Sequence, residues 1–326
     1  MKKKFVICLL VIALNLLAAF LLYYFTQVHV PPGMQRVYLC ISRVSNTPGA
    51  SPSHTETECT YDKYGNMLTY QYTTNGSRYS DKTIRYTYDE KNRLLTSETY
   101  DKDGKLTLQL IYTYDGLKTT ISGTRYSGNW QKPYNQYFIY DSQGKLLEDE
   151  STIYFYDAAG NLIKTESTTS DSYALYEYDL HGNLLTFAEF SGGQEICSAY
   201  YSYDNRNNKI EETQLEGGEL KYRMTYAYDN SNNLIEEVRM TADGYRDVNT
   251  FTYDSHNRLK SETVSPNVTY VRNYDQHGNK TSTCLYEGDS MTSIVEYHYV
   301  EFLLSTEQAQ KVLAQQEKMF GQLNFP

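Results

Sequence analysis

Aspartates recur about every 25 residues along this chain, and they are the first residues whose type and spacing could suggest chemistry. Their carboxylates could bind a metal ion, or two of them could serve as the acid and base of a glycosidase. Three histidines each follow such an aspartate by two residues, namely His181, His256 and His277. The aspartates are Asp62, Asp89, Asp115, Asp141, Asp157, Asp179, Asp204, Asp229, Asp254 and Asp275.

A structural role explains these residues better than catalysis or metal binding does. Successive hairpin turns at one edge of a sheet lie about 10 Å apart, so two turn aspartates could not share a metal ion with oxygen ligands at about 2.0–2.6 Å. The sequence contains no G-x-S-x-G, H-E-x-x-H, Gly-Lys-Ser/Thr or Cys-x-x-Cys motif, and no pair of Asp or Glu residues stands out from the rest. We therefore expect no catalytic residue, no cofactor and no metal site, and we predict that the protein is not an enzyme.

Each aspartate belongs to a repeat of the form Y-x-Y-D-x-x-(G/N)-N-(L/I), of which the sequence holds ten copies and a decayed one at Tyr297–Val300. The two tyrosines lie on one face of a strand, the aspartate accepts hydrogen bonds at the start of a tight turn, and the Gly or Asn supplies a positive φ. Only the copy at Asp115 breaks this turn, because it runs directly into Gly116 and Leu117. The predicted turn pairs are Asp62 with Gly65, Asp89 with Asn92, Asp141 with Gly144, Asp157 with Gly160, Asp179 with Gly182, Asp204 with Asn207, Asp229 with Asn232, Asp254 with Asn257, and Asp275 with Gly278.

A second set of turn signals lies between the copies, so each repeat is predicted to be one β-hairpin. About twenty antiparallel strands in sequence form a meander, and an open sheet of that length curls or splits. We therefore expect an all-β protein, in which a long twisted antiparallel meander over residues 59–300 rolls into a spiral or partial shell. The signals are Asn75–Gly76, Asp103–Gly104, Gly192–Gly193, Gly217–Gly218, Asp243–Gly244 and Gly288–Asp289.

The N-terminal segment, residues 1–26, predicts a transmembrane signal anchor. Lys2, Lys3 and Lys4 precede about 21 mostly apolar residues from Phe5 to Phe25, enough to span roughly 30 Å of hydrocarbon. The lysines would stay in the cytoplasm, and the C-terminal domain would lie outside it, in a single-pass protein of the cell membrane. The alternative is a protein that is secreted after cleavage of a signal peptide.

Residues 27–58 are predicted to be a linker that contains a strand at Arg36–Val44. Cys40 and Cys59 flank the loop that follows this strand, and an oxidising exterior would permit a disulfide between them.

Residues 301–326 predict a C-terminal capping helix and a tail, because Ser305-x-x-Gln308 has the form of a capping box and an apolar stripe follows it at helical spacing. We expect this helix to cover the exposed edge of the last strand, since a bare edge invites aggregation. A helix that binds a partner is the alternative.

The composition of 35 Tyr, 11 Phe and one Trp is typical of a half-buried sheet. Tyrosine rings with Asn, Gln and Asp beside them could bind sugars, although the rings could equally pack against one another across strands. Without the three N-terminal lysines the chain has 27 basic and 40 acidic residues, so its charge argues against nucleic acid as a partner.

The repeated YxYDxxGNL motif, which covers roughly residues 60–299, resembles the YD repeats of bacterial Rhs proteins, wall-associated proteins and animal teneurins. The resemblance implies a spiral β-sheet that forms a hollow shell, which encloses a C-terminal toxin in complete members, while several surface members are thought to bind carbohydrate. The sequence has no Asp-Pro dipeptide, so the DPxG signatures of the Rhs core and its self-cleaving aspartates are missing, and the residues given after Phe302 are too few for the toxin expected of a complete member. Ten hairpins also suggest a partial shell.

Two functions follow from these expectations. The leading hypothesis is a non-catalytic, membrane-anchored, extracytoplasmic protein for binding or adhesion at the cell surface. It would contact the membrane through residues 5–25, and a glycan, envelope component or protein through its tyrosine-rich face. The alternative is a partial shell or orphan fragment of an Rhs-type toxin system that encloses or binds another polypeptide.

Overall fold

The computed structural model describes residues 33–48, 53–75, 81–128, 130–264 and 267–316, which fold into one antiparallel sheet of 22 strands and the helix α2 (Thr306–Gln316). The strands follow one another around the sheet in chain order, as expected of a meander. They are β1 (Met34–Thr47), β2 (Ser53–Tyr61), β3 (Met67–Thr74), β4 (Lys82–Tyr88), β5 (Leu94–Asp101), β6 (Leu106–Asp115), β7 (Lys118–Ser127), β8 (Trp130–Tyr140), β9 (Leu146–Asp149), β10 (Thr152–Tyr156), β11 (Leu162–Ser167), β12 (Ser172–Tyr178), β13 (Leu184–Ser191), β14 (Gln194–Tyr203), β15 (Lys209–Glu216), β16 (Glu219–Tyr228), β17 (Leu234–Thr241), β18 (Arg246–Tyr253), β19 (Leu259–Val264), β20 (Val268–Tyr274), β21 (Lys280–Glu287) and β22 (Ser290–Ser305).

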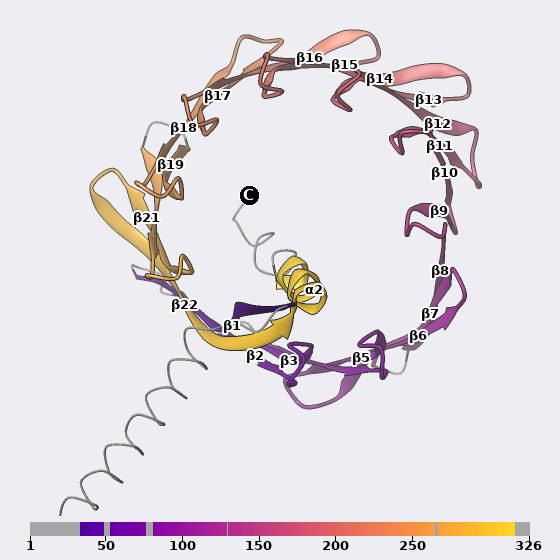
Figure 1. Cartoon of the computed structure of the whole chain (residues 1–326), viewed down its shortest axis with the longest axis vertical. Helices are drawn as coiled ribbons and strands as arrows, with labels where there is room; N and C mark the ends of the chain where they lie inside the picture. The colour runs from indigo at the N-terminus through magenta and orange to yellow at the C-terminus, as the bar shows by residue number, and fades with distance from the viewer. Residues whose placement is uncertain (1–32, 49–52, 76–80, 129, 265–266, 317–326) are drawn as a thin grey trace, which may run out of the picture.

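The sheet closes on itself, because β1 pairs with β2 on one side and with β22 on the other. The closing register runs from Met34 opposite Ser305 to Asn46 opposite Ile294, with one irregularity between Cys40 and Ser42. Figure 1 shows the resulting ring end-on. The expectation of an open spiral or partial shell is therefore wrong. The curl of successive hairpins brings the two ends of the meander together, and their pairing removes the open edges that a spiral would expose.

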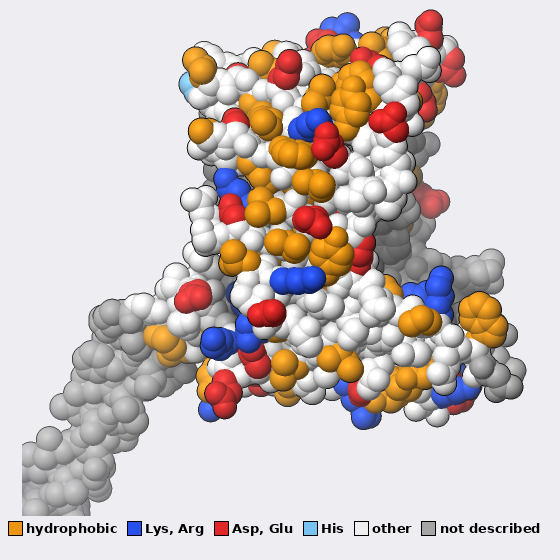
Figure 2. All heavy atoms as spheres, turned by 90° about the vertical axis from the view of Figure 1, so that its right-hand side faces the viewer, with side chains coloured by type: hydrophobic (Ala, Val, Ile, Leu, Met, Phe, Trp, Pro, Cys, Tyr) orange, Lys and Arg blue, Asp and Glu red, His pale blue; other side chains and the backbone are white. Residues whose placement is uncertain are grey.

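The two kinds of turn lie at opposite ends of the strands. In Figure 1 the aspartate turns curl toward the inside of the ring, while the hairpins that join β13 to β14 and β15 to β16 flare outward. The outer wall carries apolar side chains scattered among charged and neutral ones (Figure 2), and Phe155, Ile163 and Leu175 are each 38–39% exposed there. The wall is thus a single layer of strands, stabilised by its hydrogen-bonded ladder and by contacts between neighbouring strands.

Helix α2 lies inside the ring against β1 and β22, where it builds the main apolar cluster (Figure 1). Ser305 caps it, since the Ser305 Oγ accepts a hydrogen bond from the N–H of Gln308 at 3.2 Å. A Cβ on Gly65 would meet the Leu304 side chain at 2.9 Å, so this turn needs glycine for the close approach as well as for its φ of +75°. The members of the cluster are Val37, Leu39, Leu304, Ala309 and Val312.

The expected role of this helix as the cover of a free strand edge is also wrong. The edge of β22 is occupied by β1, so there is no open edge for α2 to cover. The helix instead packs against the inner rim of the ring, beside the first two aspartate turns, where the Lys311 Nζ donates a hydrogen bond to the Asn92 carbonyl.

Two expectations for the N-terminal part have different outcomes. The predicted membrane segment at residues 5–25 lies outside the described residues, and no helix within the described ranges is long and apolar enough to cross a membrane. Cys40 and Cys59 are described, and both are buried free thiols, so the disulfide that the sequence permits is not present.

Candidate binding surface on the inner wall

In every aspartate turn except the one at Asp115, the carboxylate accepts the backbone N–H four residues later, as the turn at Asp229 illustrates. The Asp229 Oδ1 accepts the backbone N–H groups of Ser231 at 2.8 Å and of Asn233 at 2.9 Å, and its Oδ2 accepts the Asn233 side-chain amide at 2.9 Å. The residue at the fourth position has a positive φ, which is 66° for Asn232. The carboxylate therefore accepts hydrogen bonds from backbone N–H groups that have no partner strand within the turn.

The other predicted turn residues lie in equivalent places. A positive φ is found at Gly65, Asn92, Gly144, Gly160, Gly182, Asn207, Asn257 and Gly278. A backbone hydrogen bond joins each of these residues to the carbonyl of its own aspartate, namely Asp62, Asp89, Asp141, Asp157, Asp179, Asp204, Asp254 and Asp275. The copy at Asp115 has the shorter turn expected of it, since Asp115 pairs directly with Lys118.

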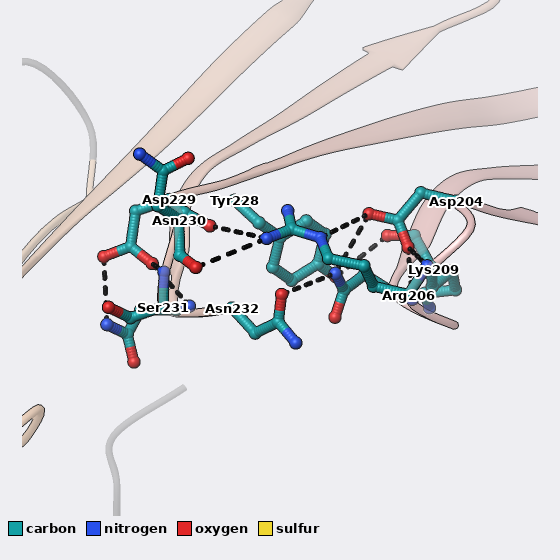
Figure 3. Close-up of polar contacts among 10 residues, drawn as sticks. Asp204, Arg206, Lys209, Tyr228, Asp229, Asn230, Ser231 and Asn232 are labelled. Atoms are coloured by element: carbon teal, nitrogen blue, oxygen red, sulfur yellow. Dashed lines mark hydrogen bonds and ion pairs between the residues drawn. The ribbon is translucent and has the colours of Figure 1, made fainter.

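Neighbouring turns also contact one another, which the sequence reasoning missed. The Asn208 side-chain amide donates to its own Asp204 at 3.0 Å and to the Asn232 Oδ1 of the next turn at 3.3 Å. The Arg206 guanidinium reaches across the same gap to the carbonyls of Asp229 at 3.3 Å and Asn230 at 3.5 Å (Figure 3). Equivalent amide bonds join Asn66 to Asn92, Asn183 to Asn207, and Asn233 to Asn257.

These contacts give the turn residues a structural role. The side-chain amide and backbone N–H of Asn233 hold the pKa of Asp229 below its usual range, and the backbone and guanidinium of Arg258 lower the pKa of Asp254 to about 2. No group of three or more His, Cys, Asp and Glu side chains that could hold a metal ion occurs among the residues the structure describes. His181, His256 and His277 each donate a backbone N–H to the turn aspartate two residues earlier.

The tyrosine that precedes each turn faces the inside of the ring. Tyr61 shows this directly, because its hydroxyl accepts a hydrogen bond at 2.9 Å from the Gln316 side chain of α2, which lies inside the ring (Figure 1). Since side chains alternate along a strand, both tyrosines of each Y-x-Y pair lie on this inner wall.

The hydroxyls of these inner tyrosines join each hairpin to the one before it. Tyr228, for example, donates to the Lys209 carbonyl at 2.8 Å, and Figure 3 shows both residues beside the turn contacts. The ten bonds measure 2.7–3.0 Å, and the donors are Tyr61, Tyr88, Tyr114, Tyr156, Tyr178, Tyr203, Tyr228, Tyr253, Tyr274 and Tyr299.

A polar cluster on the inner wall of β15 and β16 is centred on Glu212. Its carboxylate forms an ion pair with the Lys209 Nζ at 2.7 Å and accepts the hydroxyls of Tyr222 at 3.0 Å and Tyr226 at 3.3 Å. Burial opposes ionisation of Glu212, but these partners outweigh it and hold its pKa below the ordinary value. Burial and the bond to Glu212 raise the pKa of Tyr222 to about 12.

Beside this cluster the inner wall of β16, β17 and β18 forms a pocket of about 330 Å³. The Arg239 guanidinium lies 4.8 Å from the centre of the Tyr222 ring, and the Asn249 side-chain amide donates to the Glu237 carboxylate at 3.1 Å. The lining residues are Tyr222, Met224, Glu237, Arg239, Asp247 and Asn249.

This inner pocket combines an aromatic ring, a thioether, an amide and charges of both signs, which suits a ligand with both apolar and charged parts. One sequence signal could have indicated it. Glu212, Glu237 and Glu262 each follow a turn aspartate by eight residues, so they recur at one position of the repeat.

Comparisons with known proteins give a fold likeness only. No family model and no curated protein matches the chain. Among solved structures it is similar to TcdB2-TccC3-Cdc42, with 15% identity and a TM-score of 0.31 over 78% of this chain and 19% of that one. It is also similar to a porin-like protein from Bacteroides uniformis, with 11% identity and a TM-score of 0.30 over 79% of this chain and 96% of that one.

The chain thus spans about a fifth of the length of the TcdB2-TccC3 chain. Scores this low carry no argument about function. The closed, repeat-built all-β fold is seen in the structure itself, whereas the comparisons do not show the YD-repeat family, which the motif only resembles.

Proposed function

We propose that this protein is a non-catalytic hollow scaffold that holds another polypeptide against its inner wall. The observation that carries the proposal is the pairing of β1 with β22, which turns the tyrosine-bearing face of the sheet into the lining of an enclosed space. Location outside the cytoplasm is part of the proposal and rests on the apolar sequence at residues 5–25.

The size of the ring supports this function. Twenty-two strands spaced about 4.8 Å apart give a circumference of about 105 Å and a diameter of about 34 Å before strand tilt is considered. Inward side chains occupy about 5 Å on each side, which leaves a width of about 24 Å. An extended chain fits in that width, and so does a helix about 10 Å across.

The contacts of α2, a segment of the same chain, support the proposal. The Gln308 side chain donates to the Tyr64 carbonyl at 2.9 Å and to the Asn66 Oδ1 at 3.0 Å, and the Gln316 side chain reaches Tyr61. Backbone carbonyls, amides and tyrosine hydroxyls thus serve as partners for the polar groups of a polypeptide segment. An enclosed chain would meet the same groups at the other repeats.

The adhesion hypothesis has less support than the scaffold. It depended on tyrosine rings open to a large external ligand, but the Y-x-Y pairs face the enclosed side. Ten inner tyrosines also donate their hydroxyls to backbone carbonyls. A glycan on a cell surface would have to enter the ring to reach them.

Photo-crosslinking from the two faces of one strand tests the scaffold. Benzoylphenylalanine is placed at Gln214, which pairs with Tyr222 on the inner face, or at its neighbour Thr213 on the outer face as the matched control. Each variant is irradiated with unstructured 20-residue peptides of basic, neutral or acidic composition, and binding of a soluble glycan panel is measured in parallel. We expect peptide cross-links from position 214 and none from position 213. Equal cross-linking from both faces, or saturable glycan binding without peptide binding, would overturn the proposal.

A further inference from the structure

We propose that the inner pocket between β16, β17 and β18 binds a cationic side chain, the ammonium of Lys or the guanidinium of Arg, presented by a polypeptide inside the ring. The inference rests on the proposed scaffold function and adds the chemistry by which the scaffold selects its ligand. The two groups that would receive the cation are the carboxylates of Glu237 and Asp247.

The repeat provides an internal comparison for Glu237. Three inward-facing glutamates occupy the same position after successive turn aspartates, and two of them form an ion pair within the chain. Glu212 is paired with Lys209 at 2.7 Å, and Glu262 is paired with Arg272 at 2.6 Å. Within the described ranges Glu237 has no such cation, and its side chain accepts a hydrogen bond only from the neutral amide of Asn249. Glu237 lines the inner pocket together with Arg239 and Asp247, so its carboxylate is open to a ligand from that side.

The second carboxylate lies on the adjacent strand. In the strand register Asp247 of β18 lies opposite Arg239 of β17, and Asn249 lies opposite Glu237. The two carboxylates therefore lie on neighbouring strands and on the same wall. Asp247 accepts the backbone N–H of Val248 at 3.1 Å and forms no ion pair in the part of the chain that is described. The Arg239 guanidinium lies against the Tyr222 ring at 4.8 Å from its centre. Two carboxylates and one guanidinium leave the inner pocket with a net charge that favours a cation.

The remaining lining suits the stem of a long basic side chain. Lys and Arg bury their methylene groups against apolar surface while the charged head makes polar contacts. Tyr222 and Met224 provide that surface, and a volume of about 330 Å³ is ample for one such side chain. Hydrogen bonds from a cation to a carboxylate are stronger than neutral ones, and a neutral sugar would form none of them.

The test measures binding of fluorescent 15-residue peptides, unstructured and built on Gly and Ser, to the full chain by anisotropy. One peptide carries three arginines, and its partner carries three citrullines, which keep the shape and lose the charge. We expect the arginine peptide to bind about tenfold or more tightly than the citrulline peptide, with an affinity that falls as salt rises. Free spermidine is added as a competitor, because it presents ammonium groups without a peptide backbone.

Substitutions in the inner pocket test whether the preference for the arginine peptide comes from Glu237 and Asp247. Glu237→Gln with Asp247→Asn keeps the shape of the inner pocket, and it should bring the affinity for the arginine peptide close to that for the citrulline peptide. Glu236→Gln is the matched control, since Glu236 is the exposed neighbour on the opposite face of β17 and should change nothing. Single substitutions, with circular dichroism of each variant, keep the test decisive if the double variant folds poorly.

Three results would overturn the inference. They are equal affinity for the arginine and citrulline peptides, an affinity that does not change in the Glu237 and Asp247 variants, and competition by spermidine as strong as that by the peptide. Peptides that cross-link to the inner face regardless of their charge would leave the scaffold function standing and remove only this inference.

Discussion

The tyrosine before each turn aspartate acts at the scale of single residues, and its hydroxyl matters as much as its ring. A strand ladder joins each strand to its neighbours only through the backbone. The tyrosine hydroxyl adds a bond from one hairpin to the carbonyl of the hairpin before it, as Tyr203 does to Leu184 at 2.9 Å. Tyrosine in place of phenylalanine is thus explained by a hydrogen-bond partner that the sequence does not reveal.

Removing one such hydroxyl should lower stability. We expect Tyr228→Phe to reduce the free energy of unfolding by about 0.5–1.5 kcal/mol, because the Lys209 carbonyl loses its donor in a partly buried place. Tyr200→Phe is the control, since Tyr200 is 47% exposed on the outer face. Urea unfolding followed by circular dichroism measures both variants. An equal loss of stability in the two would contradict the role given to Tyr228.

The buried thiols should react slowly. Burial raises the pKa of Cys40 to about 11 and that of Cys59 to about 12, so neither forms much thiolate near neutrality. We expect iodoacetamide at pH 8 to modify the less buried Cys197 first in the native protein, and all of these cysteines at similar rates in urea. Peptide mapping by mass spectrometry follows each site. Native labelling of Cys40 as fast as Cys197 would contradict the burial.

At the scale of elements, the contacts between turns explain why the position with positive φ is Asn in some repeats and Gly in others. Both residues tolerate the backbone, but only Asn offers an Oδ1 to the amide of the preceding turn. The turns themselves could be predicted, because their chemistry lies within five consecutive residues. The contacts between them could not, because they depend on how successive hairpins are oriented in space.

Replacing one of these asparagines by glycine separates the two roles. Asn207→Gly keeps the positive φ and removes the acceptor that the Asn183 amide reaches at 3.1 Å. We expect a loss of about 0.5–1 kcal/mol, near the low end for a hydrogen bond because the contact is exposed. Asn205→Gly in the same turn is the matched control for the greater freedom of the unfolded chain. The expectation fails if thermal unfolding shows the same shift for both.

The turn aspartates should make the ring sensitive to acid. Eight of them have folded-state pKa values below the ordinary value of about 3.9, namely Asp89, Asp141, Asp157, Asp179, Asp204, Asp229, Asp254 and Asp275. The stabilisation from these eight is complete above that pH and is lost as the pH falls through the folded values. Asp254, with a pKa of about 2, marks the lower end of this window. We expect the urea midpoint to fall between about pH 4 and pH 2. A midpoint that stays constant from pH 6 to pH 2 would contradict this account.

At the scale of the whole molecule, the closure of the ring could not be predicted from the sequence. The repeat predicts hairpins and their order, but the angle between successive hairpins accumulates over 22 strands, and the repeat does not state its value. The strands that close the ring also fall outside the regular pattern. β1 carries no copy of the motif, and β22 carries only the decayed one.

The candidate binding surface on the inner wall could be predicted only in part, because it also depends on how the strands lie beside one another. The tyrosine-rich face was recognised, and the periodic glutamates are visible in the sequence. Their partners are not, because Lys209 lies three residues before Glu212, whereas Arg272 reaches Glu262 from the next strand. An unpaired glutamate in one repeat therefore becomes apparent only when the strands are placed side by side.

A single cross-link between β1 and β22 would show whether the sheet closes into a ring. Benzoylphenylalanine replaces His298, an exposed residue of β22 whose partner in β1 is Ser42, and the irradiated monomer is digested and analysed by mass spectrometry at low protein concentration. We predict an intramolecular cross-link from position 298 to the β1 peptide around Ser42, because the two residues are register partners in the closed sheet. Cross-links confined to β21, or links to β1 that occur only between molecules, would show that the sheet is open.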